Sequence, residues 1–295
     1  MPAISVIVPT RKRNHLLPRC LQSLYAQTFE DFEIILIDDN PPESRVSSDG
    51  SLNGLLSDKR LRVIENPRPR NAAAARNFGL PEARGDWIAY LDDDDVYRPH
   101  KLERQFQFAR EAKAPLVACG LSYRLVGRTR ARYTARREFV GDELLLEFPG
   151  LYTLLHRKTN VLFNESLPNT HDIYFYQELL GAFNVDRVCN VPASLVDRYL
   201  SHGGERVSQN AEGVWRGHLA VLRDFGTRYS ERAREIFLLR ARLAYCTIRG
   251  DMFGELLKTC WHLARRNGKD DARTILGVLL CQVPFLRASI VSYGG

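Results

Sequence analysis

The sequence predicts an α/β fold with a mostly parallel sheet flanked by helices, followed by a helical C-terminal extension. Two observations predict it. In the first hundred residues, short β-branched apolar runs alternate with segments whose apolar residues recur at helical spacing. From about Ala211 onward helical patterns dominate, interrupted at Gly226, Gly250 and Gly268.

The elements of the first half follow one another as strand, helix, strand. We expect strands over 4–9, 33–37, 60–65 and 87–91, and helices over 17–25, 72–80 and 99–113. Crossover helices on both faces produce a parallel sheet, whose ligands collect at the carboxyl ends of its strands. Both Asp38-Asp39 and the run Asp92 to Asp95 stand at such ends.

After residue 115 the pattern becomes shorter and mixed. The expected strands are 116–126, 159–163, 187–191 and 195–199. An arginine-rich segment, 124–137, is predicted to be a surface loop or hairpin that faces either an acidic acceptor or solvent.

Length and composition indicate a folded protein of one large or two modest domains. A chain of 295 residues with 44% hydrophobic composition can form a full core. The six cysteines show no Cys-x-x-Cys or zinc spacing, which indicates reduced thiols in a cytosolic protein. The N-terminal apolar run is too short for a signal peptide, and no stretch of about 18 apolar residues is uninterrupted. We therefore expect a cytoplasmic chain without a membrane span.

The net charge of +7 belongs to the C-terminal third. Residues 215–295 hold 14 Lys and Arg against 7 Asp and Glu, so residues 1–214 are neutral overall. Interleaved basic and apolar residues suit a peripheral helix on the anionic inner face of the cell membrane, or an ordinary helical subdomain with a solvated arginine face. A nucleic-acid partner is not expected, because the first 214 residues carry no basic excess.

The run Asp92 to Asp95 directly follows the apolar strand 87–91. Crowded carboxylates repel one another unless a cation or donors compensate their charge. Mg²⁺ or Mn²⁺ held by one or two carboxylates and by substrate phosphates would do so. A solvated acidic turn is the alternative. A calcium loop fails, because Val96 and Tyr97 occupy its fifth and sixth positions, where a ligand and glycine are needed.

Several ordered blocks resemble one family. They are Ser5 to Thr10, Ile35 to Asp39, Ala75 to Gly79, Ala83 to Asp95 and Pro99. Together they resemble the family 2 inverting glycosyltransferases, which have the Rossmann-like GT-A fold. The resemblance covers residues 3 to about 208. It implies a glycosyltransferase domain over 1–210, with a nucleotide-binding half at 1–115 and an acceptor half at 116–210, followed by the basic helical region 211–295.

The resemblance implies donor-binding and metal-binding residues. The donor contacts would be Pro9, Thr10, Arg13, Asp39, Arg76, Asp92, Asp93 and Arg206, and the metal ligands Asp94, Asp92 and His202. Asp39 would accept the imide proton of uracil, which favours uridine over cytidine. Thr10 could instead cap the next helix, and Arg76 could form an ordinary ion pair on a helix surface. The segment His202 to Ser208 would close over the diphosphate, or serve only as a glycine-rich linker.

The resemblance places the catalytic base in the second half. The family's Phe-Asp-Glu-x-Leu, followed three residues later by Glu-Asp, aligns with Phe163 to Asp172. Asp172 would take the base role, although it could also cap the helix that follows. Asn164 and His171 depart from the usual acids. A cationic His171 would lower the pKa of Asp172.

These residues together predict a metal-dependent, inverting transferase. It would move a sugar from a UDP-sugar to an acceptor hydroxyl on a glycan or lipid-linked glycan during surface glycan assembly. A nucleotidyltransferase is one alternative, but the turn from Pro9 to Asn14 lacks the glycine of its phosphate loop. A non-catalytic nucleotide-sugar or glycan-binding module on the same fold is the other, suggested by Asn164 and His171.

Overall fold

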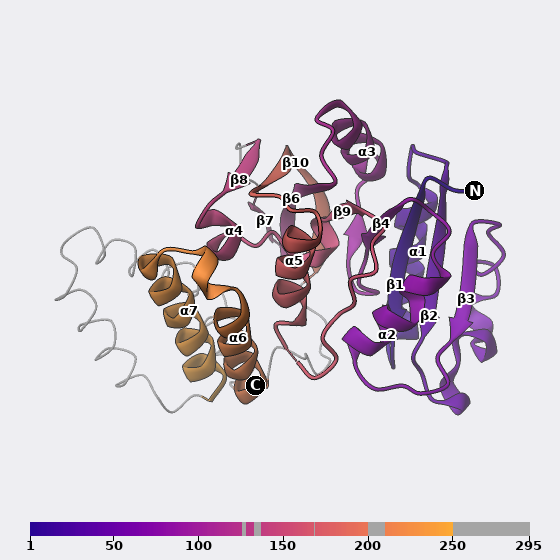
Figure 1. Cartoon of the computed structure of the whole chain (residues 1–295). Helices are drawn as coiled ribbons and strands as arrows, with labels where there is room; N and C mark the ends of the chain where they lie inside the picture. Colours follow the sequence, from indigo (N-terminus) through magenta and orange to yellow (C-terminus); the bar gives the residue numbers. More distant parts are fainter. Residues whose placement is uncertain (126–127, 133–136, 168, 200–209, 250–295) are drawn as a thin grey trace. The chain divides into compact units, whose positions relative to one another are not determined.

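The computed structural model describes residues 1–125, 128–132, 137–167, 169–199 and 210–249 (Figure 1). Side chains of residues 125–136 are outside this description. The chain forms two compact units, residues 1–204 and 205–295. The first unit carries the sheet, and the second carries helices; each is described by itself.

One mixed sheet organises the first unit. Four parallel strands form one side of it: β3 (Leu61–Glu65), β2 (Phe32–Asp38), β1 (Ile4–Thr10) and β4 (Trp87–Tyr90). The order continues through β9 (Leu155–Arg157), β6 (Leu116–Leu125), β10 (Arg187–Tyr199) and β5 (Val96–Tyr97). Strand β9 is antiparallel to β4 and β6, and β6 is parallel to β10. Two short strands, β7 (Arg128–Arg132) and β8 (Glu138–Val140), pair with β6 and β10.

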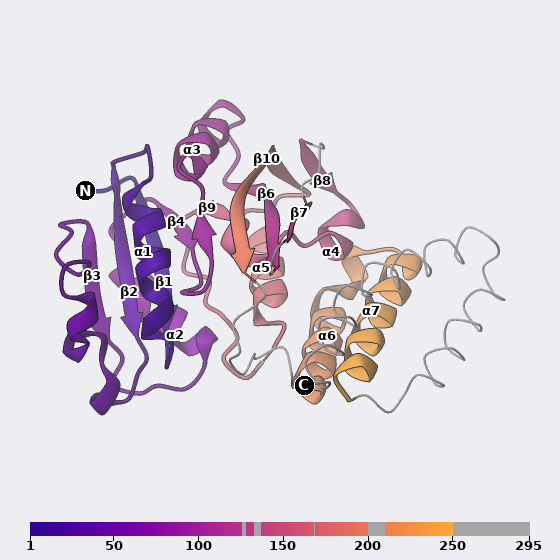
Figure 2. The ribbon, with the colours of Figure 1, turned by 180° about the vertical axis from the view of Figure 1, so that it is seen from behind.

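Helices cover both faces of this sheet. Figure 2 shows α1 (Leu17–Tyr25) in front of β1, whereas α2 (Ala72–Gly79) and α5 (His171–Ala182) lie on the face seen in Figure 1. The remaining helices of this unit are α3 (Lys101–Glu111), α4 (Glu143–Leu146) and 3-10 turns at Asn14–Leu16, Pro42–Ser44, Val46–Ser48, Gly50–Leu52, Leu80–Glu82 and Leu151–Thr153. The strand order places α1 and α2 on opposite faces of the sheet. The chain moves from β1 outward to β2, and it later crosses back from β3 to β4 on the other side of β1.

Alternate residues of the central strands supply the two halves of the core. Val6, Val8 and Leu36 pack with Leu21 of α1 in one fully buried cluster. On the other face, Tyr90 makes edge contacts with Phe163 and Phe175. The strands are therefore buried on both faces, which explains why their sequences are near-continuous apolar runs.

The chain approaches β1 closely at one glycine. A Cβ on Gly85 would lie 2.7 Å from the carbonyl carbon of Ile4, and the Gly85 amide donates to Ser5 Oγ at 2.9 Å. No side chain fits at this distance from backbone atoms. Gly85 therefore fixes how the segment before β4 enters the sheet.

The predicted α/β fold is confirmed, and two predicted elements are corrected. Residues 159–163 form no strand, since Phe163 is held by Asn77, whose side chain both accepts from the Phe163 amide and donates to its carbonyl. The two strands predicted at 187–191 and 195–199 are one strand, β10. The arginine-rich segment contains the β6–β7 antiparallel pairing of a hairpin.

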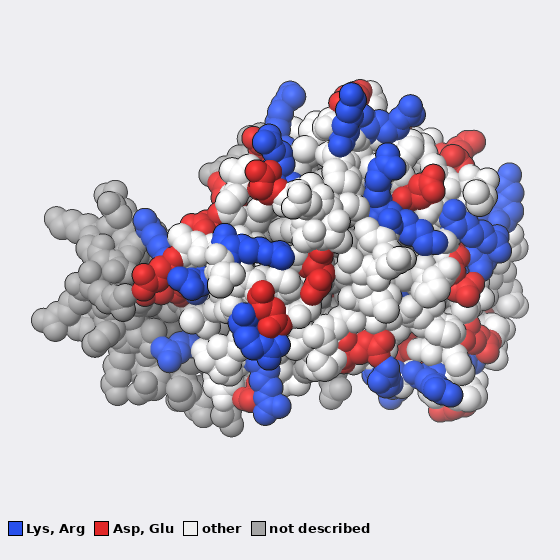
Figure 3. Space-filling view, in the orientation of Figure 1, with Lys and Arg blue, Asp and Glu red and all other residues white. Residues whose placement is uncertain are grey.

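The described part of the second unit consists of α6 (Ala211–Phe225), a 3-10 turn at Gly226–Arg228 and α7 (Glu231–Arg249). The Asn210 side chain caps α6 by accepting from the Gly213 amide at 2.9 Å. Among the described residues, no helix is both long and apolar enough to cross a bilayer. On the face shown in Figure 3, basic side chains are interspersed with acidic ones over the described elements.

Candidate active site at the carboxyl edge of the sheet

The carboxyl ends of β1, β2 and β4 bring together acids that are far apart in sequence. Thr10 pairs with Asp38 across β1 and β2, and the Asp39 amide donates to the Thr10 carbonyl at 2.9 Å. The run Asp92 to Asp95 begins directly after Leu91, whose amide donates to Ile7 of β1. Parallel pairing thus delivers all of these residues to one edge, where open α/β sheets bind ligands.

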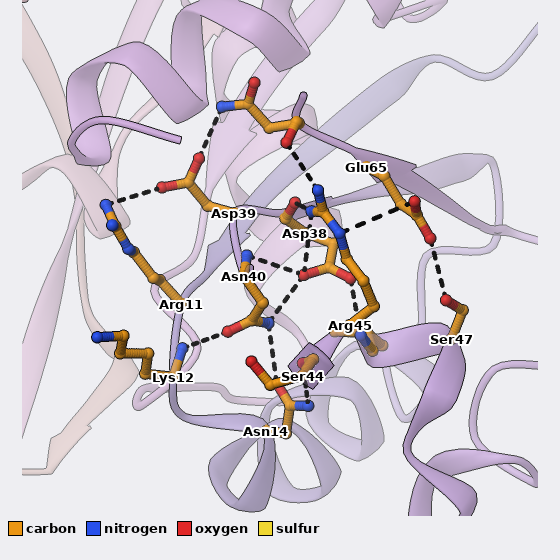
Figure 4. Close-up of polar contacts among 12 residues, drawn as sticks. Arg11, Lys12, Asn14, Asp38, Asp39, Asn40, Ser44, Arg45, Ser47 and Glu65 are labelled. Carbon is orange, nitrogen blue, oxygen red and sulfur yellow. Dashed lines mark hydrogen bonds and ion pairs between the residues drawn. The ribbon is translucent and has the colours of Figure 1, made fainter. Parts of the chain in front are cut away.

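Asp38 builds the turn after β2. Its side chain is fully buried, and its two oxygens accept from the backbone amides of Asn40 at 3.1 Å and Val46 at 2.7 Å (Figure 4). Arg45 donates to the Asp38 carbonyl at 2.6 Å and to the Asn66 carbonyl at 3.0 Å. Because the amides of Asn40 and Val46 occupy both carboxylate oxygens, Asp38 is a structural residue.

Asp39 is held differently. One oxygen accepts from the Asn66 side chain at 2.6 Å, and the other lies 3.6 Å from Nη1 of Arg11 (Figure 4). Burial raises the pKa of Asp39 from its ordinary value, while Asn66 and Arg11 oppose the rise. The carboxyl group is therefore fixed in orientation at the edge, where it can accept a further hydrogen bond.

Asp93 is directed into the protein. Its side chain is fully buried, accepts from Thr10 Oγ1 at 2.8 Å and lies 2.7 Å from Nη2 of Arg13. Burial raises the pKa of Asp93 to about 7, although Arg13 lowers it. Thr10 therefore anchors the acidic loop and does not cap a helix. Pro9, one residue earlier, is buried opposite Ile37 within the sheet.

The other three acids of the run converge. Asp92, Asp94 and Asp95 each offer a carboxylate oxygen, and these oxygens all lie within 4.8 Å of one another. Burial, followed by the charges of Asp94 and Asp92, raises the pKa of Asp95 well above its ordinary value, despite opposing contacts that include the Tyr199 amide. Such crowding of hard oxygen ligands fits Mg²⁺ or Mn²⁺, whose charge would offset the repulsion.

Basic side chains hold this cluster in place. Arg13 Nη1 lies 3.0 Å from Asp94 Oδ2, and Arg19 donates to the Asp94 carbonyl at 2.7 Å. The Arg19 guanidinium also covers the ring of Tyr199, 3.6 Å from its centre. Both arginines come from the segment after β1, so this segment holds the acidic loop in place through Asp94.

Arg76 joins the acidic loop to α5. Its side chain is almost fully buried, and Nη2 lies 2.6 Å from Asp92 Oδ1. Nη1 lies 3.0 Å from His171 Nε2 and 3.6 Å from Asp172 Oδ1. Burial would lower the pKa of Arg76, but Asp92 and Asp172 outweigh it and raise this pKa. The buried guanidinium is a bridge between two acids and not an ion pair on a helix surface.

Asp172 lies in the first turn of α5. The helix begins after Thr170, whose φ of 66° is left-handed, and Thr170 makes no side-chain cap. His171 Nε2 is 2.9 Å from Asp172 Oδ1. Burial would raise the pKa of Asp172, yet His171, Arg76 and Arg198 hold this pKa well below its usual range. Asp172 keeps 34% of its side-chain surface exposed, so it is accessible to a substrate.

With this geometry established, comparison with known proteins identifies the family. A family model described as Glycosyl transferase family 2 matches residues 5–174, which is more than half of the chain. The chain belongs to glycosyltransferase family 2. The match includes the acidic loop, Arg76 and Asp172.

Individual relatives agree with this membership. The UDP-Glc:alpha-D-GlcNAc-diphosphoundecaprenol beta-1,3-glucosyltransferase WfgD of Escherichia coli is 35% identical over 104 residues, covering 35% of this chain and 39% of WfgD. The chain spans about two fifths of the length of the first curated relatives that it matches.

Solved structures share the fold of this glycosyltransferase chain. S. aureus TarS 1-349 in complex with UDP-GlcNAc has a TM-score of 0.63 at 19% identity, covering 93% of this chain and 90% of that one. The mannosyltransferase PcManGT from Pyrobaculum calidifontis, in complex with GDP-Man and Mn2+, has a TM-score of 0.57 at 14% identity, with 96% and 81% covered. The resemblance to the GT-A fold is therefore confirmed.

The segment from Phe163 to Glu165 is attached to α2. Asn77 binds the Phe163 backbone, and its side chain donates to Glu165 Oε1 at 2.9 Å. Asn71, which caps α2, donates to the Glu165 carbonyl at 3.1 Å. Arg70 forms an ion pair with Glu165. These contacts fix the loop that leads to Asp172.

Two predicted site residues, His202 and Arg206, lie outside the described residues. The others gather at the carboxyl edge or in the segments attached to it. The sequence reasoning did not single out Asn66, which orients Asp39, or Arg198, whose charge lowers the pKa of Asp172. Neither belongs to a local motif. Asn66 follows β3 and Arg198 is in β10, so only the pairing of the strands brings them to the site.

Proposed function

We propose that this chain is a metal-dependent, inverting glycosyltransferase that moves a sugar from a UDP-sugar to an acceptor hydroxyl. The observation that carries the proposal is the bridge made by Arg76. It joins Asp92, at 2.6 Å, to Asp172, at 3.6 Å. An acid suited to binding the cation of the donor diphosphate and an acid suited to proton abstraction are therefore neighbours, as a direct displacement requires.

In this proposal each acid has its own role. Asp39 accepts the uracil N–H, since an ionised carboxylate can only accept. Asp92, Asp94 and Asp95 would hold Mg²⁺ or Mn²⁺. The bound cation supplies neutralisation of the charge that develops on the leaving diphosphate. Asp93, buried against Thr10 and Arg13, anchors these two residues.

Asp172 acts as the base. The acceptor oxygen forms a bond to the anomeric carbon while the bond from that carbon to the diphosphate breaks. The acceptor's proton moves to the carboxylate of Asp172, and the bonding electrons leave with UDP. Attack from the side opposite the diphosphate inverts the anomeric centre. Arg76 balances the charges of Asp92 and Asp172 before the transfer.

The partners are proposed by analogy. TarS is named in complex with UDP-GlcNAc, and WfgD is named as a transferase from UDP-Glc to a diphosphoundecaprenol-linked sugar. A UDP-sugar donor and a lipid-linked glycan acceptor in surface polysaccharide assembly follow. The proposed location is the cytoplasm, with peripheral contact to the inner face of the cell membrane through the basic residues after 211.

Thermal unfolding with nucleotides tests the donor site. We would heat the chain with UDP, GDP, CDP, dTDP or ADP, each with Mn²⁺ or EDTA. At one hundred times its dissociation constant, UDP with Mn²⁺ should add about 2.7 kcal/mol, a shift of several degrees. EDTA or Asp94→Ala should abolish the shift. Stabilisation by GDP and not by UDP would contradict the choice of uracil as the nucleotide base of the donor.

A transfer assay tests the chemistry. A panel of UDP-sugars is offered with a lipid-linked sugar acceptor, and the anomeric configuration of the product is determined by NMR. The proposal expects an inverted linkage with the wild-type chain and loss of transfer, with UDP binding retained, in Asp172→Asn. Nucleotide binding without transfer from any donor would favour the binding module instead.

A further inference from the structure

Arg198 is a cation at the site whose hydrogen-bonded partner is neutral. It lies one residue before the end of β10, and its side chain is only partly exposed. Nη1 donates to Tyr152 Oη at 3.1 Å, and the guanidinium lies over the Tyr152 ring, 5.2 Å from its centre. Burial raises the pKa of Tyr152, so this hydroxyl stays uncharged. Among the described residues, no carboxylate forms an ion pair with Arg198.

The acids around Arg198 are each held by another group. Asp92 and Asp172 are both bound by Arg76, at 2.6 and 3.6 Å. Asp95 Oδ1 accepts from a backbone amide of β10 at 3.1 Å. These contacts leave Arg198 near three acids without direct pairing to any of them.

The charge of Arg198 acts on both sides of the site. In the acidic loop it opposes the rise that burial, and then the charge of Asp94, cause in the pKa of Asp95. At α5 it adds to the larger effect of His171 in lowering the pKa of Asp172, which burial alone would raise. Arg198 is therefore close to both the acidic loop and the proposed base, where the bond between sugar and diphosphate would break.

Part of the Arg198 guanidinium is open to a ligand. Within the described part of the chain, Nε and Nη2 have no hydrogen-bond partner, and neither is among the fully buried atoms that lack one, so both are accessible. A partly buried cation with only a neutral partner is costly unless an anion binds it. The planar fork of a guanidinium matches two oxygens of a phosphate. The chemistry of this position is therefore that of a phosphate ligand.

We propose that Arg198 is a catalytic residue that binds the β-phosphate of the donor and stabilises it as it leaves. This inference rests on the proposed function. The electron pair of the bond between the anomeric carbon and the diphosphate oxygen stays with that oxygen, so the diphosphate gains one negative charge. Nε and Nη2 of Arg198 donate to the β-phosphate beside the acidic loop. Tyr152 is a positioning residue, because its hydroxyl and ring hold the guanidinium in place.

Nucleotide affinity tests this contact without turnover. UMP lacks the β-phosphate, so the ratio of UDP affinity to UMP affinity, measured by calorimetry with Mn²⁺, isolates the contact. Arg198→Met should lower this ratio about 10- to 100-fold, and Arg198→Lys, which keeps the charge without the fork, should lower it less. Arg187→Met, at an exposed position of the same strand, is the matched control and should not change the ratio. An unchanged ratio in Arg198→Met, with UMP still bound, would overturn the proposal.

Turnover and a second variant test the two roles separately. Because the charge on the diphosphate grows as the bond breaks, Arg198→Met should also lower kcat about 100-fold. Tyr152→Phe keeps the ring and removes only the hydroxyl acceptor, so it should lower the UDP-to-UMP ratio about 2- to 5-fold. Equal losses of UDP and UMP affinity in Tyr152→Phe would indicate a general loosening of the fold and would remove the positioning role.

A lipid-linked acceptor would bring a second diphosphate, and the kinetics distinguish the two sources. If Arg198→Met keeps the wild-type ratio and raises only the KM of a sugar-diphospholipid acceptor, Arg198 binds the acceptor's phosphate and its assignment to the donor is wrong. If the wild-type chain transfers sugar but neither ratio nor kcat changes in Arg198→Met, this inference fails and the transferase assignment stands. If the wild-type chain binds no nucleotide and transfers no sugar, the proposed function itself fails.

Discussion

His156 makes the stability of the first unit depend on pH. It is 1% exposed, and its Nδ1 and Nε2 lie 2.7 Å from the Arg157 carbonyl and 3.0 Å from Tyr90 Oη. Burial lowers the pKa of His156 from 6.5 to about 4, although the bond to Arg157 opposes this. The neutral ring satisfies both contacts, with Nδ1 donating and Nε2 accepting.

The sign and size follow from linkage. Between pH 6.5 and 4 the unfolded chain binds a proton at His156 that the folded chain does not, so stability falls as pH falls. The full difference of about 2.5 between the two pKa values corresponds to about 3.4 kcal/mol, of which about 2 kcal/mol is lost between pH 7.5 and 5. The effect reaches the site because His156 packs 5.9 Å from Phe175 of α5, the helix that carries Asp172.

Urea unfolding at pH 5 to 7.5 measures this loss. Trp215 and Trp261 are replaced by Phe, so that Trp87 in β4 reports on the unit that contains His156. As the pH falls from 7.5 to 5, the free energy of unfolding of wild type minus that of His156→Gln should decrease by about 2 kcal/mol. His15→Gln, at an exposed position, is the matched control. A pH-independent difference for His156→Gln would refute the reasoning.

Three further changes test the site and the fold. Asp172→Asn should lower kcat about 10²- to 10⁴-fold without changing the Kd of UDP measured by calorimetry, whereas a binding module would show no transfer to lose. Asp39→Asn should weaken UDP binding about tenfold and narrow the preference over CDP, because a neutral amide accepts more weakly and can also donate; unchanged selectivity in the same calorimetry would remove Asp39 from the base pocket. Gly85→Ala should cost about 1–3 kcal/mol in a thermal melt, because its Cβ would meet the Ile4 backbone, whereas Gly54→Ala, which has open space, should not.

Local sequence patterns were sufficient for most of the sheet and not for its exceptions. The runs around Ile35 and Ile88 are apolar because both faces of their strands are covered, so pattern and structure coincide. Phe163 is apolar for another reason: its ring stacks on Phe175 with centres 3.8 Å apart. From the sequence alone, an apolar residue buried in a strand at 159–163 could not be distinguished from one buried by this ring contact. In β10, the pairing with β6 is irregular between Val191 and Val196, the stretch that contains Pro192, and the strand continues through this irregularity.

The composition of the acidic edge was predictable, but the role of each acid was not. Spacing alone placed Asp38 beside Asp39 and Asp93 beside Asp94. Which neighbour faces inward depends on partners such as Val46 and Thr10, which bind Asp38 and Asp93 through contacts that no local motif encodes. The pairing of His171 with Arg76, 95 residues apart, is likewise a product of packing.

Helix α2 connects the proposed donor side of the site to the proposed acceptor side. The acids of the donor side come from the first 95 residues, whereas Asp172 comes from the second half of the chain. Asn71 and Asn77 of this segment bind the loop from Phe163 to Glu165, and Arg76 binds both Asp92 and Asp172. Because Arg76 is buried between two carboxylates, removing either acid leaves a buried charge with one partner fewer, which is costly. Asp92 and Asp172 therefore share one guanidinium, and loss of the Asp92 carboxylate would leave Arg76 with Asp172 of this pair even without substrate.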